Sequence, residues 1–237
     1  LKSVFDHALF RKKEHAQSDY ALYLFHYVRT MHFSVFDERK QFMKEATLLV
    51  AHCASSPRFS EFDLRSYMNA LNLLLEASYF NQNFEQMNIA LQTLKKLPVN
   101  SERDKTAQFI YYSRFSLVYY DRLGDRKAKM KEIDDAWHTI RKMERKIPFH
   151  IRISSLVTYS SALMEMGEYS KALDWIGLFQ QKKKEEEART DVQSILLMLQ
   201  LIAHYELGNT LLVKNIVPNI ARFIRKAGQQ GAFEKIA

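Results

Sequence analysis

Apolar residues recur three and four positions apart along almost the whole chain, and Ser, Thr or Asp stands just ahead of most apolar runs. On an α-helix this spacing gathers the apolar side chains on one face. The small polar residues suit the first turn, because their oxygens accept hydrogen bonds from its free amides. No segment shows the strict alternation of a β-strand. The pattern therefore predicts an all-α protein.

Breaks in the pattern divide the chain into helices joined by short links. Pro57, Pro98 and Pro148 mark three breaks, because proline cannot donate to a helix and disfavours helical geometry in the residue before it. The predicted helices cover residues 2–15, 18–33, 37–54, 61–81, 84–97, 102–123, 126–146, 150–166, 169–186, 190–207 and 210–227.

Three local features refine these helices. Ser60 and Ser101 are each followed three residues later by Asp, which predicts a capping box at the start of two helices. Pro218 falls inside the last predicted helix, and we expect it to kink or split that helix.

One turn sequence returns at a nearly constant period. If Gln82, Gly124, Gly167 and Gly208 are equivalent, the spacings between them are 42, 43 and 41 residues. An earlier copy is expected at Phe33–Phe36, 48 residues before Gln82. Self-similarity at such a period predicts an array of stacked helical hairpins.

The fourth copy of this turn carries the most specific motif. Gly167-Glu168-Tyr169, followed by Ala172, resembles the tetratricopeptide (TPR) repeat, in which glycine ends the first helix and an aromatic residue opens the second. The preceding helix keeps the small position of that repeat as Ser160, while its aromatic positions differ. The positions that correspond to the Trp, Leu, Gly and Tyr of the repeat are Leu156, Tyr159, Ser160 and Leu163.

The resemblance implies a right-handed α-α superhelix, a TPR-like solenoid of about five helical hairpins over residues 18–227. We expect residues 1–237 to form a single domain. In it, residues 1–17 form a leading helix and residues 228–237 begin a further element. We also expect that the native chain continues beyond this sequence or that the solenoid ends self-associate, because open ends leave apolar surface exposed.

The same resemblance implies where a partner would bind, because the first helix of each hairpin lines the concave face in such arrays. The expected partner is a protein or peptide segment, since amides bond to extended backbone and Arg or Tyr anchor interfaces. The function expected is a non-catalytic scaffold, with a regulatory module as a variant. The candidate binding residues are Asn69, Asn72, Glu76, Tyr79, Tyr111, Arg114, Asp121, Arg122, Glu165 and Glu206.

Charge offers an alternative function. Lys and Arg number 35 against 27 Asp and Glu, giving a net charge of +8, and a basic stretch lies in the predicted helix at 126–146. This stretch could bind nucleic acid. However, four acidic residues interrupt it, and alternating signs are typical of a solvated helix face rather than a phosphate-tracking surface. Nucleic-acid binding therefore ranks second.

The sequence contains no motif that is typical of a catalytic or metal-binding site. The eight histidines lack the spacing of a zinc or carboxylate-bridged site, and the glycines form no phosphate-binding loop, so no metal or cofactor is expected. Cys53, the one cysteine, is expected to be a small buried residue and suits a reducing compartment, which favours the cytoplasm. No apolar run reaches the length of a membrane span.

Overall fold

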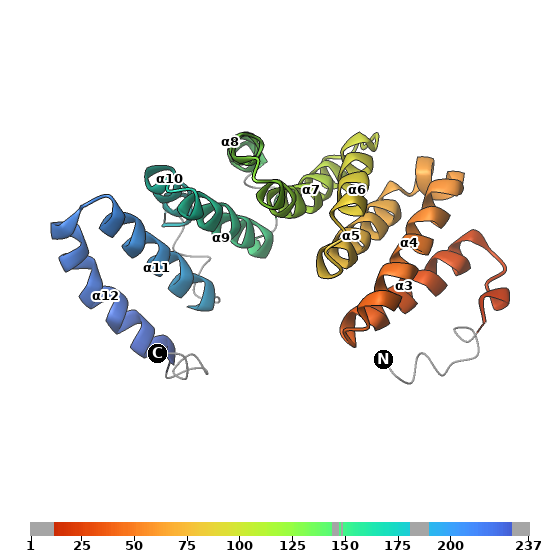
Figure 1. Ribbon diagram of the computed structural model, residues 1–237, viewed down its shortest axis with the longest axis horizontal. Helices are drawn as coiled ribbons and strands as arrows, with labels where there is room; N and C mark the ends of the chain where they lie inside the picture. Colours follow the sequence, from red (N-terminus) through yellow and green to blue (C-terminus); the bar gives the residue numbers. More distant parts are fainter. Residues whose placement is uncertain (1–11, 144–146, 148, 181–189, 229–237) are drawn as a thin grey trace. The chain divides into compact units, whose positions relative to one another are not determined.

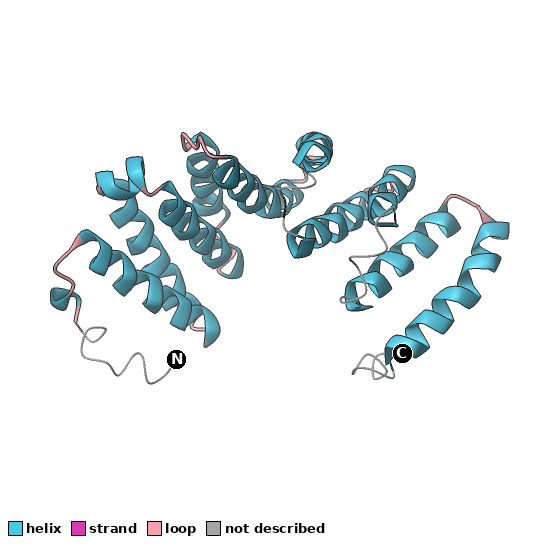
Figure 2. Ribbon diagram, turned by 180° about the vertical axis from the view of Figure 1, so that it is seen from behind, coloured by secondary structure: helices cyan, strands magenta, loops and turns pink. Residues whose placement is uncertain are grey.

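The computed structural model describes residues 12–143, 147, 149–180 and 190–228, and every regular element among them is helical (Figures 1 and 2). Two short turns are present, the 3₁₀ turn η1 (Lys13–His15) and the π turn η2 (Arg58–Phe62). The α-helices are α3 (Asp19–Val35), α4 (Arg39–Ser55), α5 (Leu64–Phe80), α6 (Phe84–Lys96), α7 (Glu102–Leu123), α8 (Arg126–Met143), α9 (Phe149–Glu165), α10 (Tyr169–Gln180), α11 (Thr190–Glu206) and α12 (Thr210–Gly228).

The helices predicted from residue 18 onward agree with α3 to α12 to within three residues wherever the ends are described. The predicted leading helix is wrong where it can be checked, because residues 12–18 contain only the 3₁₀ turn η1. The rest of that helix, at residues 1–11, lies outside the described residues, as do residues 229–237 of the expected further element.

Helix starts show one confirmed cap and one correction. Ser101 accepts a hydrogen bond from the backbone N–H of Asp104 at 3.0 Å and donates its hydroxyl to the Asp104 carboxylate at 2.6 Å. The capping box predicted at Ser60 is wrong, because the Ser60 hydroxyl donates to the Ser56 carbonyl inside the π turn. Asp63 caps α5 instead, and its carboxylate accepts from the Ser66 amide at 3.1 Å.

Pro218 does not split its helix, contrary to part of the prediction. Helix α12 continues unbroken from Thr210 to Gly228 with Pro218 in its interior. Pro218 is exposed, so water can bond to the carbonyl of Lys214 that the missing N–H leaves without a partner.

The same turn geometry ends the first helix of each hairpin, and each turn contains one residue with a left-handed backbone. In every case the N–H of that residue bonds three residues back, and the next N–H bonds five residues back, which is the Schellman motif. The first copy is centred at Asp37, 45 residues before Gln82, rather than at Phe33–Phe36. The five residues are Asp37, Gln82, Gly124, Gly167 and Gly208, with φ between 54° and 73°.

The chain forms two compact units, one from Leu1 to Asp125 and one from Arg126 to Ala237. In the first unit, α3 packs on α4, α4 on α5, α5 on α6 and α6 on α7, and the first helices α3, α5 and α7 also contact in sequence. In the second unit, α9 packs on α10, α10 on α11 and α11 on α12, and α9 also contacts α11. Each hairpin within a unit therefore buries its apolar flank against the next one.

In the first, second and fourth hairpins, two buried positions stand at the same distances from the turn. Eleven residues before and eight residues after the left-handed residue, α9 and α10 bury Leu156 and Trp175. Trp175 stacks on Tyr159, with ring centroids 4.6 Å apart. Among the residues on which the TPR resemblance was based, the helix positions Leu156, Tyr159, Ser160, Leu163 and Ala172 are buried.

The first hairpin fills the equivalent two positions with a buried polar pair. His26 Nδ1 lies 2.9 Å from Glu45 Oε2, and Arg29 Nε donates to Glu45 Oε1 at 2.9 Å. Burial alone would raise the pKa of Glu45, but the hydrogen bonds from His26 and Arg29, together with the positive charge of Arg29, lower it below its usual value. A charged group therefore lies where the second and fourth hairpins bury apolar side chains, Leu71 with Ala90 and Leu156 with Trp175.

Glu45→Ala is expected to lower the free energy of unfolding by about 3 kcal/mol at neutral pH, because it leaves buried His26 and Arg29 without their acceptor. The Glu45 carboxylate contributes stability above its unfolded pKa of about 4.5 and loses it as the pH falls through the lower folded value. Urea unfolding at several pH values measures both effects. A difference from wild type that stays constant below pH 4.5 would contradict the assignment.

Gln82→Gly is expected to raise the free energy of unfolding by about 0.5–1 kcal/mol. Relief of the left-handed strain, about 1–2 kcal/mol, exceeds the extra freedom that glycine gains in the unfolded chain, about 0.4–1 kcal/mol. The matched control is Gly124→Ala, which adds a Cβ in open space and is expected to destabilise for backbone reasons alone. Thermal unfolding of the wild type and the two variants measures the order of their stabilities.

Candidate functional site

A row of polar side chains follows one side of α5, the first helix of the second hairpin. Asn69, Asn72 and Glu76 are partly exposed, and Tyr79 is 46% exposed at the end of the row. Their spacing of three and four residues keeps them on one side of the helix. We call this side of α5, together with the corresponding sides of α3 and α7, the first-helix face of the first unit. The corresponding sides of α9 and α11 are the first-helix face of the second unit.

The two asparagines of this row differ in their hydrogen bonding. The Tyr111 hydroxyl on α7 donates to Asn69 Oδ1 at 2.9 Å, which joins the faces of α5 and α7. One turn further along α5, Asn72 Oδ1 is shielded from solvent and has no hydrogen-bond donor among the described residues. The fold's own hydrogen bonds therefore do not hold this amide, and rotation about its Cβ–Cγ bond could turn it toward a bound chain.

The other three predicted residues on α7, Arg114, Asp121 and Arg122, are exposed. Arg114 lies over the ring of Phe115, with its guanidinium carbon 5.0 Å from the ring centroid. Asp121 and Arg122 stand at the end of α7, next to the turn at Gly124. Of these three residues, Arg122 lines the surface hollow described next, as does Tyr79.

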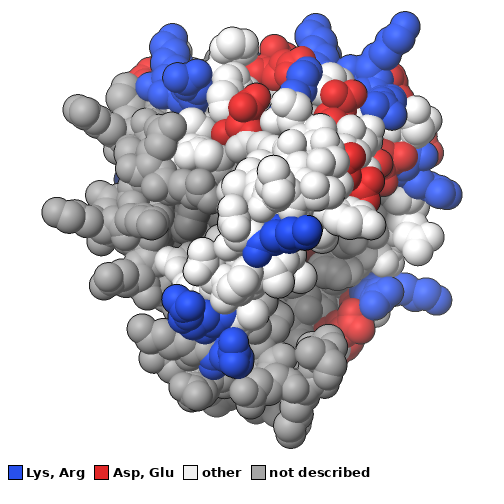
Figure 3. Space-filling view, turned by 90° about the vertical axis from the view of Figure 1, so that its left-hand side faces the viewer, with Lys and Arg blue, Asp and Glu red and all other residues white. Residues whose placement is uncertain are grey.

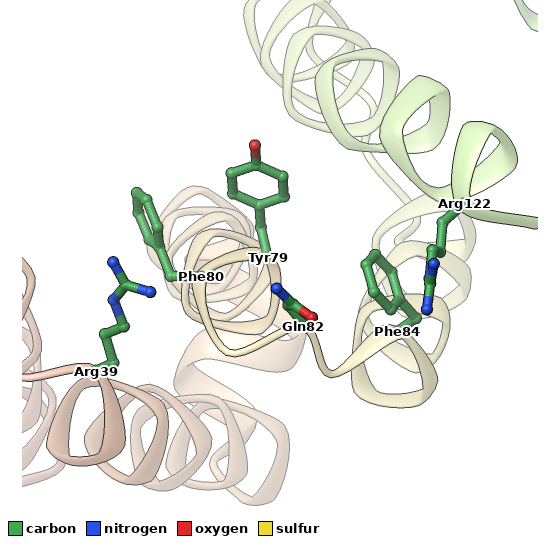
Figure 4. Close-up of a pocket in the computed structure, with 6 residues that line it drawn as sticks. All are labelled: Arg39, Tyr79, Phe80, Gln82, Phe84 and Arg122. Atoms are coloured by element: carbon green, nitrogen blue, oxygen red, sulfur yellow. The ribbon is translucent and has the colours of Figure 1, made fainter.

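A surface hollow of about 400 Å³ lies beside the turns of the first unit, and we call it the turn hollow. Figure 4 shows Arg39 and Phe80 on one side of it, Phe84 and Arg122 on the other, and Tyr79 and Gln82 between them. None of these six lining residues is acidic. The turn hollow therefore combines exposed aromatic surface with two guanidinium groups.

Each side of the turn hollow has an arginine close to a phenylalanine ring. The two pairs stand at the same positions relative to successive turns, but the arginine and the phenylalanine exchange places. Arg39, two residues after the left-handed residue of the first turn, lies 6.0 Å from the ring of Phe80, two residues before that of the second. At the next step, Phe84 takes the place of Arg39 and Arg122 takes the place of Phe80, at 5.3 Å. Arg39, Phe80, Gln82 and Phe84 were not predicted, although aligning the turns on both sides would have paired them.

The second unit places its predicted residues apart. Glu165 Oε2 lies 3.1 Å from Lys129 Nζ on α8, so it is engaged with the second helix of the preceding pair. Glu206 is exposed at the end of α11. Counted back from the left-handed residue of the turn, the positions that form the polar row on α5 form an apolar row on α11. This apolar row was also not predicted. It consists of Ile195 (39% exposed), Met198 (41%), Ile202 (43%) and Tyr205 (67%).

Comparison with known proteins bears on the fold. No family model matches the chain, and no curated protein matches its sequence. Among solved structures, the chain is similar to nearly identical TPR-like repeats attributed to a kinesin light chain of Podospora anserina. The TM-score is 0.64 at 11% sequence identity, over 86% of this chain and 94% of that one. The chain has the TPR-like fold.

The resemblance read from Gly167 and its neighbours is thus confirmed at the level of the fold, as is the all-α arrangement of sequential hairpins. The right-handed superhelical path stays a prediction. None of the helices in the described parts of this TPR-like chain is both long enough and apolar enough to cross a membrane.

The basic helix of the TPR-like array is less basic at its surface than its sequence suggests. Lys129 has only 6% of its side chain exposed and pairs with Glu165, and Asp134 lies 3.5 Å from Lys171 of α10. Arg145 and Lys146 lie outside the described residues. On the face viewed in Figure 3, the blue Lys and Arg side chains of the described residues lie in several small groups among white uncharged surface, and red acidic side chains lie beside the groups at the top and right.

Titratable groups with shifted pKa values lie in the core rather than at either surface. Burial raises the pKa of the Cys53 thiol to about 12, and burial also raises the pKa values of Tyr23 and Tyr67. Cys53 is fully buried, as the sequence predicted. No group of three His, Cys, Asp or Glu side chains within the described residues is placed to hold a metal ion.

Tyr111→Phe is expected to lower the free energy of unfolding by about 1 kcal/mol, because it removes the hydrogen bond to Asn69 between α5 and α7. The control is Tyr205→Phe, at an exposed tyrosine, which is expected to stay within about 0.5 kcal/mol of wild type. Denaturant titration of both variants measures the difference. Equal stabilities would show that the bond between the two helices contributes nothing.

Proposed function

We propose that the protein is a non-catalytic scaffold that binds a segment of a partner protein on the first-helix faces of its units. The TPR-like fold supports a protein partner, because stacked hairpins present repeated positions along one continuous face. The single buried cysteine is compatible with a cytoplasmic protein.

The apolar row on α11 carries this proposal. Its four side chains, Ile195, Met198, Ile202 and Tyr205, are 39–67% exposed and follow one side of the helix. Contiguous apolar surface on a soluble domain is typical of an interaction site, since its burial against a partner removes it from water. The matching positions on α5 are polar. In both units, therefore, a row of one chemical kind stands at the same positions relative to the turn.

The polar row of the first unit supplies groups that suit a peptide backbone. The amide of Asn72 is not held by internal hydrogen bonds, and amides both donate to and accept from extended chain. Tyr79, at the end of the same row, and Arg114, on α7, are exposed and are residue types that commonly anchor interfaces.

The placement of shifted pKa values supports a binding role over a catalytic one. Functional acids and bases commonly have perturbed pKa values and lie in clefts. Here Glu45, Cys53, Tyr23 and Tyr67 all pack inside the first unit, and none of them lines the turn hollow or the first-helix faces.

We expect two double variants, Asn72→Ala with Arg114→Ala and Ile202→Ser with Tyr205→Ser, each to reduce partner recovery at least about tenfold in affinity capture from the native source. Each variant removes side chains from one first-helix face without opening the core. Quantitative mass spectrometry of the captured proteins measures the ratio to wild type.

The matched control is Gln92→Ala with Lys96→Ala, which removes an amide and a cation from exposed positions on α6, a second helix. It is expected to recover partners as wild type does. Circular dichroism must show the same helix content for all variants. Equal recovery by the control and the two face variants would contradict the proposal.

A further inference from the structure

We infer that the turn hollow is a docking site for an acidic segment of a partner protein, whose carboxylates bind the guanidinium groups of Arg39 and Arg122. The inference rests on the proposed function, since it gives the chemistry of the partner. It assigns to that partner a second contact, beside the turns, which only Tyr79 and Arg122 share with the first-helix face.

Both arginines of the turn hollow have their guanidinium group close to a phenylalanine ring, Arg39 near Phe80 and Arg122 near Phe84. Contact with the ring stabilises the cation and leaves its N–H edge for a planar, bidentate acceptor such as a carboxylate. The two cations stand on opposite sides of the hollow, so they select two separated acidic groups rather than one (Figure 4).

The existing charges near the hollow leave both cations available. Arg39 Nε lies 3.0 Å from Asp37 Oδ1, but the side chains are 56% and 73% exposed, and such exposed pairs contribute little. The exposed surface of Tyr79 and Phe80 between the cations can cover the apolar parts of a bound segment.

Gln82 is a second, independent indication. It lines the hollow and adopts a left-handed backbone with φ of 54°, where the third, fourth and fifth turns use glycine. Strain of this kind gathers at binding sites. The Gln82 amide can donate to a carboxylate and accept from a backbone N–H of the docked segment.

Single-stranded nucleic acid is the competing occupant, because aromatic and arginine side chains also bind bases and phosphates. The described surroundings favour the acidic peptide. A phosphate backbone needs a run of clustered cations, whereas two arginines, on opposite sides, line this hollow.

Fluorescence polarisation with the full 237-residue chain tests the inference. The probes are a labelled synthetic peptide of alternating Glu and Gly, the same peptide with Gln in place of Glu, and a labelled oligouridylate. We expect binding of the Glu peptide alone. Arg39→Ala and Arg122→Ala are each expected to weaken it at least about tenfold, and added salt to weaken it further.

Gln82→Gly separates recognition from folding. It is expected to weaken binding of the Glu peptide several-fold without lowering the thermal midpoint of the protein. The matched control is Arg103→Ala. Arg103 is an exposed arginine at the other end of α7, about 28 Å from Arg122 along the helix, and the variant is expected to bind as wild type does.

Three results would overturn the inference: equal binding of the Gln peptide, tighter binding of the oligouridylate, or an equal loss of affinity in Arg103→Ala. The failure of the proposed function gives a different result. In that case partner capture is unaffected by Asn72→Ala with Arg114→Ala, while Arg39→Ala still abolishes binding of the Glu peptide.

Discussion

The packing of each hairpin against the next is the interaction on which the structure depends. A pair of helices cannot enclose its own apolar flank, so α5 is buried only because α3, α4, α6 and α7 surround it. Within each hairpin, the left-handed residue of the turn ends the first helix, because it closes the two Schellman hydrogen bonds.

A constant register lets the core and the surfaces differ independently between hairpins. Eleven residues before and eight residues after the turn, the buried pair is Leu156 and Trp175 in one hairpin and His26 and Glu45 in another. On the first-helix face, a polar row on α5 and an apolar row on α11 occupy the same positions. Partner chemistry can therefore vary from hairpin to hairpin while the helices keep their packing.

Helix positions were predictable because they depend on local spacing and on breakers such as Pro57 and Pro98. The capping at Ser60 was not, because a π turn at Arg58–Phe62 moves the cap to Asp63. The binding face stays a prediction. The repeat alignment selected the polar row of α5 but not the apolar row of α11, since exposed and buried apolar residues look alike in a sequence.

The sequence by itself determined the helices, the repeat of about 42 residues and the TPR-like fold, because each follows from short-range periodicity and turn residues. Only the tertiary structure decided which side chains meet. Tyr111 reaches Asn69 across 42 residues, and Arg39 and Phe80 meet across 41. Such contacts depend on how one hairpin stacks on the next, and stacking is set by the shapes of whole faces rather than by any local pattern.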